Sequence, residues 1–450
     1  MTKKGVSPLF FEAALISLII FTPLLYGSVG TLALAIAQGV IMSVFIVFFA
    51  RFAFLKPYKI FYPPYFYLLF IFIAIAVFQL LPQPSFFLKI ISPQTVFLNQ
   101  KYMPQGEEVK FFPLALYTLA AKREIIKFIA YFAIFFLTVN TINKKEQFQR
   151  AVLTIIFLGI ALAVYGLVKK YYVLGSDVTG SFSSFGNKNH FAGYMVMIVP
   201  LTVGYALHIQ NKLYKFLVGF AAALISVSVF LSLSRGGLIS LFFALFTMAI
   251  LSRRERLMRG KAWVITTTII LSIGLILVSG SEPAKERFSA LWPGFLGRLE
   301  IVENSLAIVK DFPVFGVGLG NFQYIFTSYK QLTSTAYYDY LHNDHLQLIV
   351  EMGLAGAFFY FFFLYKILSD IFRKLKQRCD IFAKSIVLGG FSGLLGVILH
   401  SFFEFNFHIP ATAFLFWFIL GLSYKCVNTH FYLPGESFTA KNSDSSLGHG

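Results

Sequence analysis

The chain contains little charge for its length. Of its 450 residues only 13% are Asp, Glu, Lys or Arg, whereas 57% are hydrophobic, and the mean hydropathy is +0.73. Soluble domains carry about 25% charged and roughly 45–50% apolar residues. The shortage of charge therefore excludes an ordinary soluble protein, and we expect the chain to fold within a lipid bilayer.

Acidic residues and cysteines are also scarce. Twenty acidic residues face 38 basic ones, for a net charge of +18. The basic residues fall in short connectors between apolar runs, the positive-inside pattern of membrane proteins, so we expect no nucleic acid partner. The only two cysteines, Cys379 and Cys426, lie in or beside connectors expected to face the cytoplasm. A structural disulfide is therefore not expected.

Long apolar runs dominate the rest of the sequence. A membrane-spanning helix needs about 20 mostly apolar residues, and twelve runs satisfy this requirement. They predict an all-α polytopic membrane protein with about twelve transmembrane helices. We expect the first run to remain as a span, because no cleavage site of small residues follows it. The runs are 9–26, 31–50, 64–81, 124–142, 151–168, 191–208, 214–233, 236–251, 262–279, 346–368, 383–400 and 410–427, of which 214–251 could instead be one unit broken near 234–237.

The basic connectors define an orientation. They recur in alternate connectors, which predicts that these connectors and both termini are cytoplasmic. The prediction is a single transmembrane domain over residues 1–430 and a disordered cytoplasmic tail over residues 431–450, which is rich in Ser, Gly, Asn and Asp. The connectors span residues 51–59, 144–150, 212–215, 253–261 and 366–378.

The opposite face receives segments 82–123, 169–190, 280–345 and 401–409. Segment 280–345, between the ninth and tenth spans, is too long for a simple connector, and such loops are usually functional. Within it, residues 298–311 predict an amphipathic helix that ends before Pro313. The apolar face of that helix is expected to contain Leu299, Val302, Leu306 and Val309. The sequence assigns no role to residues 82–123.

Four outward-facing groups of polar residues are candidates for chemistry. Arg235 lies at a break between two spans, where it needs either a snorkelling conformation or an anionic partner. The adjacent glycines allow a ligand to approach, and a guanidinium suits a diphosphate because it donates two parallel hydrogen bonds. The groups are 181–190 with Asn187, Asn189 and His190; 234–237 with Arg235; Arg298 with Glu300 and Glu303; and His342, Asn343, Asp344 and His345, followed by Glu351.

His342 has three interpretations: a general base, a structural histidine, or a metal ligand together with Asp344 and His345. The glycine-rich residues 316–320 follow a helix rather than a strand, so they do not form a dinucleotide-binding fingerprint. We expect that loop to pack its backbone against a ligand or a span. The turn 404–410, which contains Glu404 and His408, is interpreted mainly as structural, with a functional role left open.

Taken in order, these stretches resemble the O-antigen ligase and polymerase superfamily. The resemblance extends over residues 180–425 and rests on segments 180–200, 232–237, Arg298 with 311–318, 342–356 and 404–410. It implies a GT-C-like fold in the bacterial inner membrane. It also implies metal-independent, inverting transfer of a glycan from undecaprenyl diphosphate on the periplasmic face, without a cofactor.

The resemblance also assigns roles. Arg235 and Arg298 would bind the diphosphate and stabilise its developing charge without a metal, and His342 would be catalytic. Some relatives have two adjacent histidines, whereas here His342 precedes an asparagine. Candidate supporting residues are Asn187, Asn189, His190, Asn343, His345 and Glu351.

The acceptor cannot be assigned from the sequence. It could be lipid A-core, as for a ligase, another lipid-linked repeat, as for an O-antigen or exopolysaccharide polymerase, or a protein hydroxyl, as for a protein O-oligosaccharyltransferase. A transporter or flippase for lipid-linked glycans is the alternative from another class. It would place its polar residues near the bilayer midplane.

Overall fold

A computed structural model describes residues 8–54, 60–102, 110–173, 180–254, 291–330, 338–378, 380–429 and 431. Its long helices are α1 (Pro8–Leu24), α2 (Thr31–Phe54), α3 (Tyr67–Phe78), α6 (Thr118–Thr141), α7 (Lys145–Val168), α8 (Lys188–His208), α9 (Lys212–Leu231), α10 (Arg235–Arg254), α15 (Asp344–Gln377), α16 (Ile381–His400) and α17 (Pro410–Asn428). The other helical elements are η1 (Tyr26–Ser28), α4 (Ser85–Ile91), α5 (Pro93–Tyr102), η2 (Lys169–Val173), α13 (Leu291–Asp311) and α14 (Phe322–Tyr329). Strands β1 (Gln83–Pro84) and β2 (Phe111–Phe112) pair antiparallel.

The described helices confirm an all-α, multi-pass membrane protein. Nine of them are long and apolar enough to cross a membrane, and α1 and α3 are shorter apolar helices. Eleven of the twelve predicted runs coincide with helices, and the run 262–279 lies outside the described residues. Residues 214–251 form two helices, α9 and α10, separated at Leu233, whose φ is +60°.

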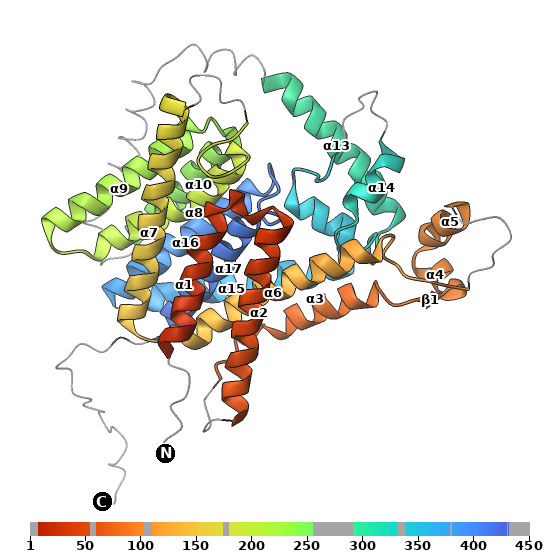
Figure 1. Ribbon diagram of the computed structural model, residues 1–450, viewed down its shortest axis with the longest axis horizontal. Helices are drawn as coiled ribbons and strands as arrows, with labels where there is room; N and C mark the ends of the chain where they lie inside the picture. The colour runs from red at the N-terminus through yellow and green to blue at the C-terminus, as the bar shows by residue number, and fades with distance from the viewer. Residues whose placement is uncertain are drawn as a thin grey trace, which may run out of the picture.

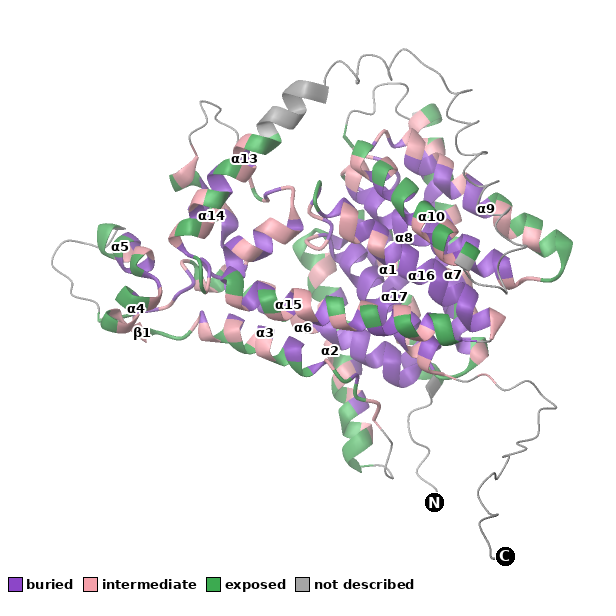
Figure 2. Cartoon of the chain, turned by 180° about the vertical axis from the view of Figure 1, so that it is seen from behind, coloured by how far each residue is buried: buried purple, intermediate pink, exposed green. Residues whose placement is uncertain are grey.

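Helices α8, α16 and α17 form the centre of the bundle, and buried residues gather there (Figure 2). Helices α8 and α16 approach closely because glycines leave room for the partner backbone. A Cβ on Gly389 would lie 2.4 Å from the carbonyl oxygen of Pro200, and one on Gly393 would lie 2.7 Å from that of Met197. Small residues at such contacts are typical of membrane helix packing.

Helices α13 and α14 lie beside each other away from the central helices, near α15 (Figure 1). The helix predicted at 298–311 is confirmed as part of α13, but only half of its predicted apolar face packs inward, through Val302 and Val309. Ile301 and Ile308 are buried in a small second core, whereas Leu299 and Leu306 are 39% and 45% exposed. The physical reason is that the inner face packs on α14 and α15. This core contains Leu98, Ile301, Ile308, Phe312, Val317, Phe322, Ile325, Phe326, Leu341 and Val350.

The glycine-rich loop packs against α15, as expected of a loop that lies on a span. Gly353 has φ +63° and kinks α15, and a Cβ at this position would lie 2.2 Å from the carbonyl oxygen of Val314. Only glycine adopts this conformation at no steric cost. The carboxylate of Glu351 accepts a hydrogen bond from the Gly320 amide at 2.7 Å. The side chain of Gln79, which directly follows α3, donates a hydrogen bond to the Glu351 carbonyl at 2.9 Å.

The hydrogen bonds of basic side chains distinguish the two ends of the bundle. At one end, Glu12 of α1 accepts hydrogen bonds from Arg150 at 2.6 and 2.8 Å, and Lys374 donates to Asn428 at 2.7 Å. At the other end, Ser184 donates to the carbonyl of Pro23 at 2.6 Å, near the turn between α16 and α17. The basic connectors 144–150 and 366–378 thus lie at one end, and which end faces the cytoplasm stays a prediction.

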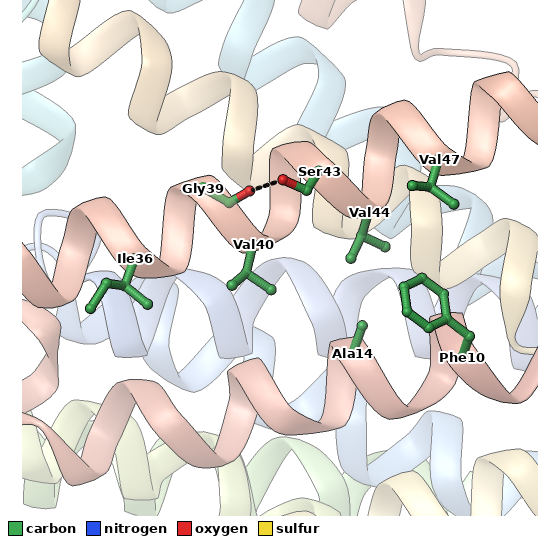
Figure 3. A pocket seen from close by; sticks show the side chains of 8 residues that line it. All are labelled: Phe10, Ala14, Ile36, Gly39, Val40, Ser43, Val44 and Val47. Atoms are coloured by element: carbon green, nitrogen blue, oxygen red, sulfur yellow. Dashed lines mark hydrogen bonds between the residues drawn. The ribbon is translucent and has the colours of Figure 1, made fainter.

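An apolar groove of about 470 Å³ lies between α1 and α2 (Figure 3). Gly39 leaves it open, and the Ser43 hydroxyl donates to the Gly39 carbonyl at 2.7 Å. The groove therefore presents hydrocarbon alone, a surface suited to contact with lipid chains rather than to chemistry.

Candidate active site

A buried carboxylate, Glu404, occupies the turn between α16 and α17 and is 1% exposed. It accepts hydrogen bonds from Nδ1 of His342 and from Nδ2 of Asn189, each at 2.7 Å. Nη2 of Arg298 lies 3.8 Å from its Oε2, and Nε2 of His190 lies 4.0 Å from its Oε1. Side chains from three separate segments therefore meet at one carboxylate.

Local structure positions each of these groups. Asn187 caps α8 by accepting a hydrogen bond from the Asn189 amide at 2.8 Å, which holds Asn189 and His190 in the first turn. Arg298, on α13, donates through Nη1 to the carbonyl of Phe403 at 3.0 Å. His342 directly precedes the cap of α15.

The backbone at His342 is strained. Its φ is +57°, in the left-handed region that non-glycine residues seldom adopt. Residues in sparsely populated conformations are concentrated at active sites, where the surrounding structure maintains them. Here the Glu404 hydrogen bond on one side and the cap of α15 on the other fix the imidazole in place.

The charge of Glu404 determines the tautomer of His342. Burial by itself would raise the pKa of Glu404, but the hydrogen bond from His342 and the electrostatic interactions with His342, His190 and Arg298 lower it to about 2. A carboxylate can only accept hydrogen bonds, so Nδ1 of His342 must carry the proton. In the neutral imidazole, Nε2 is then free to accept a proton from another group.

Arg235 lies at the start of α10, and its side chain is exposed. It forms no hydrogen bond or ion pair with another described residue. The neighbouring Gly236 packs against the same turn that carries Glu404. A Cβ at Gly236 would lie 3.0 Å from Cδ2 of His400 and 3.3 Å from Cβ of Phe403. The N-terminus of α10 thus adjoins Phe403, the residue whose carbonyl Arg298 binds.

Several candidate supporting residues do not reach Glu404. Nε2 of His345 bonds instead to the carbonyl of Ile398 at 2.9 Å. Asn343 caps α15 through the amides of His345 and Leu346, each at 3.1 Å. Glu351 holds the glycine-rich loop. Of the supporting set, Asn189 and His190 contact the carboxylate directly, and Asn187 positions both of them.

The sequence interpretation favoured a structural role for the turn that carries Glu404 and left a functional role open, and the structure places this carboxylate against His342, Asn189 and Arg298. The available signal was its place in a turn that belongs to the family resemblance. The sequence reasoning also missed Phe405, whose ring contacts those of His342 and His190 at centroid distances of 4.9 and 4.7 Å. Phe405 covers the two imidazoles and limits their contact with water.

The structure separates the residues that could have formed a metal site near His342. Asp344 pairs with Nδ1 of His408 at 2.8 Å rather than with His342 or His345. Among the described residues, no cluster of three or more His, Cys, Asp or Glu side chains has an arrangement that could hold a metal ion.

Residues 220–361 match the family model described as O-Antigen ligase. This part of the chain is therefore similar to the O-antigen ligase family. The matched region contains Arg235, Arg298 and His342, whereas Glu404 lies beyond it. The similarity, together with the nine helices among the described residues that are long and apolar enough to cross a membrane, agrees with a ligase or polymerase of the membrane. No curated protein matches the sequence.

Proposed function

We propose that this O-antigen ligase-like chain transfers a glycan from undecaprenyl diphosphate to an acceptor hydroxyl, with inversion at the anomeric carbon. The observation that carries the proposal is the meeting of His342 and Arg298 at the buried Glu404. This arrangement combines a proton acceptor of fixed tautomer with a permanent positive charge, the two functions that such a transfer requires.

The arginines act on the leaving group. When the bond between the anomeric carbon and the diphosphate oxygen breaks, that oxygen takes the electron pair and gains negative charge. Arg298 and Arg235 stabilise this charge through paired hydrogen bonds. The N-terminus of α10, where Arg235 lies, contributes the positive end of a helix dipole. A diphosphate leaves readily, so the proposed reaction needs no metal or cofactor.

His342 acts on the acceptor. The acceptor oxygen attacks the anomeric carbon while its proton passes to Nε2 of His342. Glu404 keeps the proton on Nδ1, orients the ring and stabilises the imidazolium that forms. Asn189 holds the other oxygen of the same carboxylate at 2.7 Å, which fixes the carboxylate itself.

We place this site on the periplasmic face of a bacterial inner membrane, with both termini cytoplasmic. The support is the alternation of basic connectors, which predicts the opposite end of the bundle to be cytoplasmic. Reporter fusions after residues 173 and 330 are expected to report a periplasmic location. A cytoplasmic location for residue 330 would refute the orientation.

Purified protein in detergent, given an undecaprenyl-diphosphate-linked glycan and an acceptor, tests the proposal. Arg298→Ala and His342→Ala should reach normal membrane abundance and lose transfer. Arg253→Ala, which removes an exposed arginine at the other end of α10, should retain it. Wild-type transfer by either site variant would show that the role assigned to that residue is wrong.

The same assay separates the alternative activities. Lipid A-core, a second lipid-linked repeat and a protein hydroxyl, supplied one at a time, distinguish a ligase from a polymerase and an oligosaccharyltransferase. Detergent provides no second compartment, so a flippase would give no product.

A further inference from the structure

A second polar cavity of about 160 Å³ lies beside the site described above. It is formed by the start of α6, the glycine-rich loop, α14, residues 339 and 340, α15 and the turn before α17. A cavity of about 150 Å³ holds one benzene molecule, so this one has room for a single six-membered ring. Its lining includes Arg123, Glu124, Gln323, Tyr324, Asp339 and Tyr340.

The lining is polar, and several of its groups are available to a ligand. Arg123, Gln323 and Asp339 form no side-chain hydrogen bond with other described residues. Oε2 of Glu124 is buried and has no hydrogen-bond partner among them. Each of these planar side chains has two neighbouring donor or acceptor atoms. Two such atoms can hydrogen-bond to adjacent hydroxyl groups on one sugar ring.

Aromatic rings complete the cavity and connect it to the catalytic residues. Tyr324 and Tyr340 line it, and such rings provide a flat apolar surface with a polar edge. The ring of Tyr340 stacks on Phe405 at a centroid distance of 4.5 Å, and Phe405 contacts His342 at 4.9 Å. A single aromatic side chain thus separates the cavity from the proposed base.

The charge of the lining disfavours a phosphate. The carboxylates of Glu124, Asp339 and Glu351 outnumber the guanidinium of Arg123 and the imidazole of His408, although Lys127 pairs with Glu124 at 2.5 Å. A diphosphate would be repelled here, whereas the Arg298 side of Glu404 attracts one. The ligand that suits this cavity is therefore uncharged or carries an amine.

We propose that this cavity binds one sugar ring of the glycan substrates, with its hydroxyl groups on Arg123, Gln323 and Asp339 and its face against the tyrosines. The inference rests on the proposed function, because it supplies that transfer with a subsite for the sugar next to the reacting hydroxyl. The ring belongs either to the acceptor or to the donor glycan, and both have the same chemistry.

Direct binding of monosaccharides tests the inference without requiring transfer. Purified full-length protein is titrated with glucose, galactose, N-acetylglucosamine and glucosamine, and binding is followed by saturation-transfer NMR. Gln323→Ala and Asp339→Asn should weaken binding of the preferred sugar by at least about fivefold, the effect of one lost hydrogen bond. Gln210→Ala, an exposed glutamine at the other end of the bundle, is the matched control and should bind as the wild type does. Inorganic pyrophosphate should not displace the sugar.

The results separate this inference from the proposed function. If no sugar binds, or if both cavity variants bind as the wild type does, the cavity is not a sugar subsite even when Arg298→Ala abolishes transfer. If the cavity variants lose binding but Arg298→Ala transfers normally, the subsite stands and the catalytic proposal fails. In the transfer assay, an increased KM for the acceptor alone or for the donor alone shows which glycan supplies the ring.

Discussion

Replacing Glu404 with glutamine provides the sharpest test of the site. The amide keeps the shape of the side chain and can still accept a hydrogen bond from Asn189. It removes the negative charge that fixes the proton on Nδ1 of His342 and that stabilises the imidazolium. It also removes the ion-pair partner of Arg298, whose Nη2 lies 3.8 Å away.

The lowered pKa of Glu404 and the usual contribution of a histidine base together indicate how much Glu404→Gln should slow transfer. A pKa lowered from 4.5 to about 2 means that the surroundings favour the carboxylate over the neutral acid by roughly 3 kcal/mol, at about 1.4 kcal/mol per pH unit. That stabilisation is present above pH 4.5 and is lost as the pH falls towards 2. A histidine that acts as a base contributes roughly 10²–10⁴ in rate. We therefore expect Glu404→Gln to lower kcat by about 10²–10⁴, with a smaller change in KM.

The assay is glycan transfer by purified protein, with kcat and KM measured at pH 7. Glu12→Gln is the matched control, because Glu12 is also buried and is hydrogen-bonded to an arginine and to the amide group of Gln147. Both variants should lower thermal stability, but only Glu404→Gln should lower kcat. If the two variants reduced transfer equally, or if Glu404→Gln kept wild-type kcat, the orienting role of Glu404 would be refuted.

Three further predictions follow from the same contacts. Gly193→Ala places a Cβ 2.1 Å from Oδ1 of Asn406, so it should destabilise the protein by about 1–3 kcal/mol and impair transfer. Gly219→Ala is the control, because its Cβ would have nothing within 4 Å, and it should do neither in the same melting and transfer assays. Burial by itself would lower the pKa of His408, but its hydrogen bond with Asp344 raises it above 6.5. This pair therefore stabilises the fold below pH 6.5 and loses that contribution as the pH rises through the folded-state pKa. Asp344→Asn should flatten the decline in melting temperature measured from pH 6 to 9, and an unchanged slope would contradict this. Arg298→Lys keeps the charge but loses the planar fork, so transfer should fall at least about tenfold, and full activity would show that charge alone suffices.

The sequence predicted the helices well because length and apolarity decide membrane spans. Run 410–427 corresponds to α17, and run 191–208 to α8. The sequence did not determine which face of a helix is buried. In α13, residues 299, 302, 306 and 309 and residues 301, 305, 308 and 312 repeat with nearly the same helical period. Periodicity alone could not decide which face would be buried, because the choice depends on α14 and α15.

The site shows the same division. Arg235, Arg298 and His342 were singled out because charge and imidazole near an outer surface need an explanation. Glu404 was underestimated because one acid in a short turn carries no pattern of its own. Its importance arises from contacts with residues 62 and 215 positions away in the sequence, which only the fold brings together. His345 was overestimated because it lies close to His342 in the sequence. In the structure its ring bonds to the carbonyl of Ile398 instead of reaching Glu404.

Glu404 also explains how Arg298 is held beside His342 before substrate arrives. Its single negative charge lies 3.8 Å from the permanent positive charge of Arg298, so the two charges attract and offset each other. In the proposed mechanism a diphosphate binds Arg298 from the solvent side, since 45% of the Arg298 side chain is exposed. The carboxylate remains on Nδ1 of His342 throughout. In this proposal the guanidinium of Arg298 turns to the leaving diphosphate when the donor binds, while His342 keeps the hydrogen bond with Glu404 that sets its tautomer.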